Sequence, residues 1–290
     1  MEYGDKNVKF EGFYFGKRMS SMLKVDMRRM FRSKLFYIMI AIALLVPIVM
    51  TVMLTMMDGQ ETVNQQTGEV QIMEGPESVW QSIGTLPSEE ITESDAADTA
   101  AGAAGAMGAM GSMDVMAMCN INMAFMGIAV FVCLFIAEDF RSGYAKNLFT
   151  VRAKKGDYVI SKTLAGFICG AFMLIAYFIG SMLGGAISGL SFALHGMTAG
   201  NIVMCILAKI LLMFVFVPIF VLISVAAKQK AWLSICGSLG GGMLLFMMVG
   251  MITPLTSTAL HVLLCAAGGA MFAFGLGAIS KVVLRKTSLV

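Results

Sequence analysis

Charged residues are scarce in this 290-residue chain: they make up 13% of it, against 58% for hydrophobic residues. No segment matches the glycine-rich loop ending in Gly-Lys-Ser/Thr that holds the phosphates of ATP, so we expect the chain not to bind ATP by itself. The two histidines, His195 and His261, stand apart from any His/Glu cluster, which argues against a metalloprotease. No serine or cysteine has a base at the spacing of an activated nucleophile. The sequence therefore predicts no enzyme activity.

Carboxylates are absent from the interior of the long apolar runs. Ion-coupled carriers usually place acids there, so a proton- or sodium-driven carrier is disfavoured. The six cysteines all fall within apolar segments and are not paired at short spacing, which argues against a metal site and against a disulfide framework. We interpret them as small apolar residues and expect no metal or cofactor in this chain.

What the chain does have is a series of apolar runs of about 20 residues, the length needed to cross a hydrocarbon core roughly 30 Å thick. They are predicted at residues 36–57, 116–137, 163–188, 201–227, 231–252 and 259–280. The predicted fold class is an all-α membrane protein with six transmembrane helices in residues 35–290, preceded by an N-terminal segment, residues 1–34. These spans and their connections leave no room for a soluble catalytic domain.

The basic residues predict how the chain is oriented. Of 21 lysines and arginines, 20 lie before the first span, in the 138–162 connector, in 228–230 and in the tail, which all face one side if the spans alternate. By the positive-inside rule that side is the cytoplasm, and both termini lie there. The largest connection, residues 58–115, holds eleven acids and no lysine or arginine. It is therefore predicted to be a large acidic outer loop between the first two spans.

A basic amphipathic helix is predicted just before the first span, at residues 18–34. Met19, Met22, Leu23, Met27, Met30 and Phe31 recur at helical spacing, and Lys24, Arg28, Arg29 and Arg32 take the other face. Such a helix normally lies in the membrane interface, and the alternative is a solvated extension of the first span. Ser20 or Ser21 is expected to cap its start, and Asp26 to pair with a neighbouring arginine.

The remaining base, Lys209, is predicted to lie inside the fourth span. It follows Asn201 by eight residues, which corresponds to a depth of about 12 Å. A charge inside the membrane is by default a functional candidate, here a residue of a transport pathway. The alternative is that its long stem extends toward the outer surface or that it meets an acid of the outer loop.

Small residues recur at four-residue spacing within two of the predicted spans. The pairs are Gly166/Gly170, Gly180/Gly184 and Gly237/Gly241. Such pairs let helix backbones approach closely, either within the bundle, which we favour, or at a homodimer seam.

The connector 138–162 begins with Glu138-Asp139-Phe140-Arg141-Ser142-Gly143-Tyr144-Ala145-Lys146-Asn147 and holds three acids and six bases. It is compatible with a helix and carries no catalytic signature. A charged segment of this kind, held between two membrane spans, is typical of a surface on which another protein acts.

The chain resembles the membrane subunit of bacterial ABC transporters of the ABC-2 type. The residues that carry the resemblance are this connector, Met22–Leu35 before the first span, and the later Tyr158-Val159-Ile160-Ser161-Lys162. The resemblance covers nearly the whole chain as a pattern. It implies a multi-pass permease of the bacterial cell membrane, two copies of which work with two copies of a separate cytoplasmic ATPase that binds ATP and magnesium.

The resemblance also implies roles for particular residues. The connector would be a coupling helix, whose ATPase contact is made or shaped by Glu138, Asp139, Phe140, Arg141, Gly143, Lys146 and Asn147. The 18–34 helix, with Lys24, Asp26, Arg28, Arg29 and Arg32, would be the connecting helix at the inner interface.

The near absence of charge within the spans favours amphipathic or lipophilic cargo, such as a hydrophobic peptide toxin or an antimicrobial. The acidic outer loop would attract cationic material through its long-range field. The alternative is a membrane sensor or immunity protein that binds a toxin without moving it. No interaction with nucleic acid is expected.

Overall fold

The computed structural model describes residues 6–63, 70–72, 76–83, 120–151, 155–194, 198–227, 230–253 and 257–286. Most of the acidic outer loop, the glycine- and alanine-rich run at its end, and His195 lie outside the described residues.

Long helices make up most of the described chain, as the apolar runs predict. They are α1 (Lys6–Arg32), α2 (Lys34–Met56), α6 (Ala124–Arg141), α7 (Tyr144–Val151), α8 (Lys155–Ile187), α9 (Ala199–Ala227), α10 (Ala231–Ile252) and α11 (Ala259–Lys286). A 3₁₀ turn, η2 (Ile121–Met123), leads into α6. Within the described residues, five helical segments are long and apolar enough to cross a membrane, namely α2, η2 with α6, α8 from Gly156, α9 and α11. The helix α10 occupies the fifth predicted span and has 22 residues.

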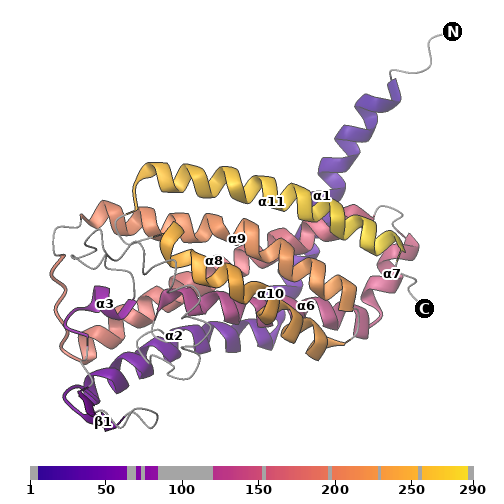
Figure 1. Cartoon of the computed structure of the whole chain (residues 1–290). Coiled ribbons are helices and arrows are strands. Elements are labelled where there is room, and N and C mark those ends of the chain that lie inside the picture. The colour runs from indigo at the N-terminus through magenta and orange to yellow at the C-terminus, as the bar shows by residue number, and fades with distance from the viewer. Residues whose placement is uncertain are drawn as a thin grey trace.

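The helices form a bundle with two distinct ends (Figure 1). The helix α7 and the C-terminal end of α11 lie at one end, where α1 also joins the bundle, and α3 (Val79–Ile83) lies toward the other. The helix α9 packs against α6, α8, α10 and α11 and buries Phe216 and Phe220 among them. Figure 1 therefore shows α1, α7 and the C-terminal end of α11 at the same end of the bundle.

The helix before the first span is longer than its amphipathic pattern predicts. It begins at Lys6 and continues to Arg32, and α2 starts two residues later. The prediction that Ser20 or Ser21 caps it is therefore wrong, because both lie in the middle of the helix. The Oγ of Ser21 instead donates to the carbonyl oxygen of Arg18 within the same helix, at 2.9 Å.

A short β-hairpin departs from the predicted all-α fold. The strands β1 (Glu61–Val63) and β2 (Val70–Ile72) pair in antiparallel register after α2. Further along, α3 packs against the end of α8: the backbone N–H of Val79 donates to the carbonyl oxygen of Ser191, and Val79 is fully buried. The α3 part of the outer loop is thus held against the helical bundle.

The glycine pairs pack inside the chain. A Cβ on Gly166 would lie 2.7 Å from Val217, and one on Gly170 would lie 2.7 Å from the sulfur of Met213. A Cβ on Gly180 would overlap the carbonyl oxygen of Leu44. These glycines let α8 approach α9 and α2 closely, which confirms the interpretation of packing within the bundle.

Candidate functional site

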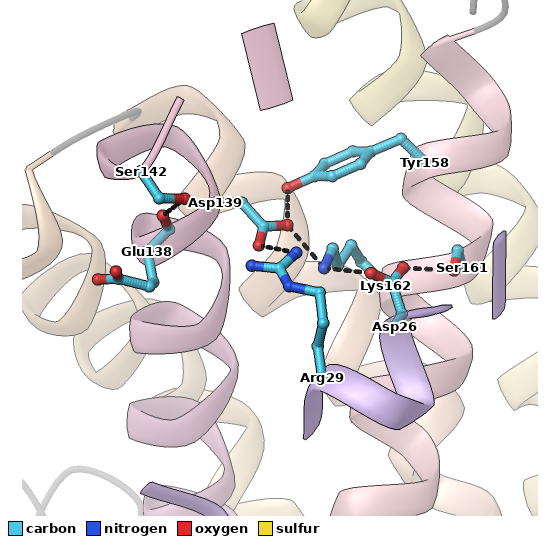
Figure 2. Close-up of polar contacts among 8 residues, drawn as sticks. All are labelled: Asp26, Arg29, Glu138, Asp139, Ser142, Tyr158, Ser161 and Lys162. Atoms are coloured by element: carbon cyan, nitrogen blue, oxygen red, sulfur yellow. Dashed lines mark hydrogen bonds and ion pairs between the residues drawn. The ribbon is translucent and has the colours of Figure 1, made fainter. Parts of the chain in front are cut away.

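Three helices meet in a buried cluster of charged side chains at the α7 end of the bundle (Figure 2). Asp26 and Arg29 project from α1, Asp139 comes from the last turns of α6, and Lys162 lies two turns into α8, beside Tyr158 and Ser161. Spacings of three or four residues place these side chains on one face of each helix. The cluster therefore joins the helix before the first span, the start of the connector and the start of the next long helix.

Lys162 bridges the two acids. Its Nζ lies 2.8 Å from Oδ1 of Asp26 and 2.6 Å from Oδ2 of Asp139. The guanidinium of Arg29 lies 2.8 Å from the other oxygen of Asp139. Each helix of the cluster is thus tied to the other two by an ion pair.

Two hydroxyl groups complete the cluster. Tyr158 donates to Oδ2 of Asp139 at 3.0 Å, and Ser161 donates to Oδ2 of Asp26 at 2.5 Å. All four carboxylate oxygens therefore have a partner. The cluster holds two cations and two anions, and its four side chains are buried or, in Arg29, 30% exposed. Compensation of this kind is what makes buried charges tolerable, because removing one partner leaves an unpaired charge in a low-dielectric interior.

Aromatic rings surround the cations and connect them to α7. The Nζ of Lys162 lies 4.1 Å from the centre of the Phe135 ring, and Arg29 lies 4.0 Å from the centre of the Tyr144 ring. Because Tyr144 is the first residue of α7, Arg29 links α1 to the connector helix as well as to α6. Cation–π contacts of this kind strengthen when water is excluded.

At the α1–α7 contact, the directions of the pKa shifts of Arg29 and Tyr144 keep Arg29 charged and Tyr144 neutral at neutral pH. Burial lowers the pKa of Arg29, but the charge of Asp139 and its hydrogen bond act in the opposite direction, and the pKa is raised overall. Burial, followed by the charge of Asp26, raises the pKa of Tyr144. Both shifts move the titrations further from neutral pH, so the contact keeps its charge state there.

A second ion pair fastens α1 to α8. The Nε of Arg18 lies 2.5 Å from Oδ2 of Asp157, which is in the first turn of α8. An acid at that position also interacts favourably with the positive end of the helix dipole.

The structure separates the predicted coupling residues into two groups. Glu138, Arg141, Lys146 and Asn147 are exposed, whereas Asp139 is fully buried and Phe140 is 9% exposed. Gly143 has a φ of +72°, a conformation that favours glycine and that lets the chain turn between α6 and α7. The buried residues therefore hold the connector in place, and the exposed ones form its outer surface.

The predicted connecting-helix residues divide in the same way. Lys24, Arg28 and Arg32 are exposed, while Asp26 and Arg29 turn toward the bundle. The expected pairing of Asp26 with a neighbouring arginine is wrong. Its ion pair is with Lys162, which is 136 residues away in the sequence, and its second oxygen accepts from Ser161.

Lys209 does not extend to the surface, contrary to the alternative considered from the sequence. It is 1% exposed, and its Nζ donates to Oδ1 of Asn122 at 2.7 Å and to Oγ1 of Thr253 at 2.8 Å. Asn122 lies in η2 and Thr253 follows α10, so the ammonium joins α9 to these two elements.

The fold and the buried charge cluster define a multi-pass helical membrane protein with a charged connector fixed between its spans. The family model described as "ABC-2 family transporter protein" matches residues 95–243, slightly more than half of the chain. The chain therefore belongs to the ABC-2 transporter family and is a transporter membrane subunit. No curated protein and no solved structure matches it.

Proposed function

We propose that this chain is the six-span permease of an ATP-driven exporter in the bacterial cell membrane, with both termini in the cytoplasm. Two copies would enclose a pathway for amphipathic or hydrophobic cargo such as peptide toxins or antimicrobials. Two copies of a separate ATPase would bind ATP and magnesium and would energise transport by hydrolysing the ATP. The observation that carries this proposal is the buried cluster that ties the connector to α1 and α8.

The exposed side of the connector is the proposed docking surface. Glu138, Arg141, Lys146 and Asn147 present charges and an amide to solvent over two helical turns. Directly behind them, Asp139 is held by Lys162 and Arg29. A partner that moves this surface would therefore move α6, α8 and α1 together, because packed and ion-paired elements shift as units rather than deform.

The cargo class follows from the spans. In residues 124–137, 199–227 and 231–252 of α6, α9 and α10, the described buried side chains are mostly aromatic and aliphatic, with a few thiols and serine hydroxyls, and Lys209 is the one base. Such a lining suits amphipathic or lipophilic molecules better than ions or sugars.

The test is ATP turnover by the permease–ATPase complex in proteoliposomes. We expect an amphipathic peptide to raise turnover several-fold above the basal rate, and a scrambled peptide of the same composition and charge to leave it unchanged. The isolated ATPase should respond to neither. Binding of the amphipathic peptide without any rise in turnover would contradict export and would favour the sensor or immunity alternative.

A further inference from the structure

The two buried lysines of the described chain have different partners. Lys162 contacts two carboxylates, whereas Lys209 contacts an amide oxygen and a hydroxyl oxygen. In the part of the chain that the structure describes, Lys209 has no ion-pair partner, and its polar neighbours include the thiols of Cys205 and Cys265. An ammonium buried among neutral groups is costly, and within a membrane span such a cost usually marks a functional site.

The groups around Lys209 are arranged as a small polar site. Asn122 is 4% exposed and Thr253 is fully buried, so both oxygens are oriented by the packing around them. Cys205, one turn before Lys209 on α9, has its Sγ 3.4 Å from the carbonyl oxygen of Thr253. A lysine ammonium has three donors, and the hydrogen bonds to Asn122 and Thr253 use two of them. One donor and one positive charge are therefore available for a singly charged anion.

An apolar hollow lies along the same helix contacts. It is lined by Phe125, Met126, Ala129, Phe216, Phe220, Ser238, Leu239 and Gly242, and its free volume is about 10 Å³, so a ligand chain enters it only when lining side chains move apart. Phe125 is one turn beyond Asn122 on α6, and Phe216 is two turns beyond Lys209 on α9, a rise of about 10 Å. The polar site and the hollow are thus neighbours along α6, α9 and α10, with the polar site nearer the outer end.

We propose that Lys209, with Asn122 and Thr253, binds a carboxylate carried on an apolar chain, and that the chain lies along the Phe125–Phe216 hollow. One ammonium compensates one carboxylate, and the neutral neighbours accept or donate without adding charge. The inference names the cargo chemistry of the proposed exporter and, in that step, rests on the proposed function.

Binding can be measured on the permease alone, in nanodiscs of phosphatidylcholine. The probes are radiolabelled octanoate and octanol, with empty nanodiscs as the reference for partition into lipid. We expect octanoate to bind the wild-type chain at least about tenfold more tightly than octanol, as a hydrogen-bonded charge pair would provide. Equal binding of the two probes would overturn the proposal.

Two variants locate the site. Lys209→Met removes the charge, and Asn122→Asp supplies an internal carboxylate of nearly the same shape beside the ammonium. Both should lose the preference for octanoate, and Lys230→Met, at an exposed lysine between α9 and α10, should keep it. If Lys209→Met fails to fold, Asn122→Asp still decides. Retention of the preference in the folded variants would contradict the proposal.

A peptide made as the free acid and as the C-terminal amide distinguishes the sources of the carboxylate. Greater ATPase stimulation by the free acid, lost in Asn122→Asp, would place a peptide C-terminus at Lys209. Octanoate binding with no such difference would assign the site to a lipid-like acid. Because octanoate binding needs no ATPase, its loss leaves the proposed export function standing, and failure of ATPase stimulation leaves the binding result standing.

Discussion

Replacing Lys162 with methionine should destabilise the protein by about 3–5 kcal/mol, the range measured when one partner of a buried ion pair is removed. Methionine matches the volume of the lysine stem but leaves Asp26 and Asp139 buried with no ammonium between them. The measurement is the midpoint of unfolding in mild detergent, followed by loss of helical circular dichroism. The matched control is Lys146→Met on the exposed side of α7, which should leave the midpoint unchanged.

A compensating variant separates charge from packing. If unpaired carboxylates cause the loss, the triple variant Lys162→Met, Asp26→Asn, Asp139→Asn should recover much of it, because neutral replacements of buried ion pairs are often tolerated. Equal midpoints for Lys162→Met and the wild type would show that the cluster does not hold these helices together.

Reversing the charges on the exposed side of the connector should abolish assembly with the ATPase. In the variant Arg141→Glu, Lys146→Glu, two exposed cations become anions while the buried cluster is untouched. Charge reversal at an interface adds repulsion to the loss of attraction, so we expect affinity for the ATPase to fall at least about a hundredfold. Binding of purified ATPase to immobilised permease measures the effect directly.

The control carries the same change in net charge elsewhere on the chain. Lys230→Glu, Lys281→Glu reverses two exposed cations outside α7, and this variant should bind the ATPase with the affinity of the wild type. Equal losses in both variants would indicate a general charge effect and would contradict docking on the exposed side of the connector.

The bundle helices could be predicted from the sequence because apolar length is a local property. The fifth span was predicted at residues 231–252, and α10 has those bounds. The third span was predicted to begin at residue 163, but α8 begins eight residues earlier, at Lys155. The additional residues include Asp157 and Lys162. These charges read as solvent-exposed in a hydropathy pattern but lie in ion pairs with α1.

The charge cluster could not be predicted because its pairs are distant in sequence. Asp26 meets Lys162 across 136 residues, and nothing in the local pattern favours that lysine over the arginines of the same helix. Which charged residues of the connector are buried likewise depends on where α1 and α8 pack against it, and the local sequence does not contain that information. Lys209 was predicted inside the fourth span and lies buried in α9, but its partners Asn122 and Thr253 lie on two other elements that the local pattern does not connect to it.

The most direct test of the account is the intact mass of the complex extracted from its native membrane in a gentle detergent. The account predicts two copies of this chain with two copies of a P-loop ATPase. It also predicts that the complex from the Arg141→Glu, Lys146→Glu variant contains the permease alone. A wild-type chain that is recovered without any ATPase would contradict the docking surface on the connector, and with it the proposed ATP-driven function.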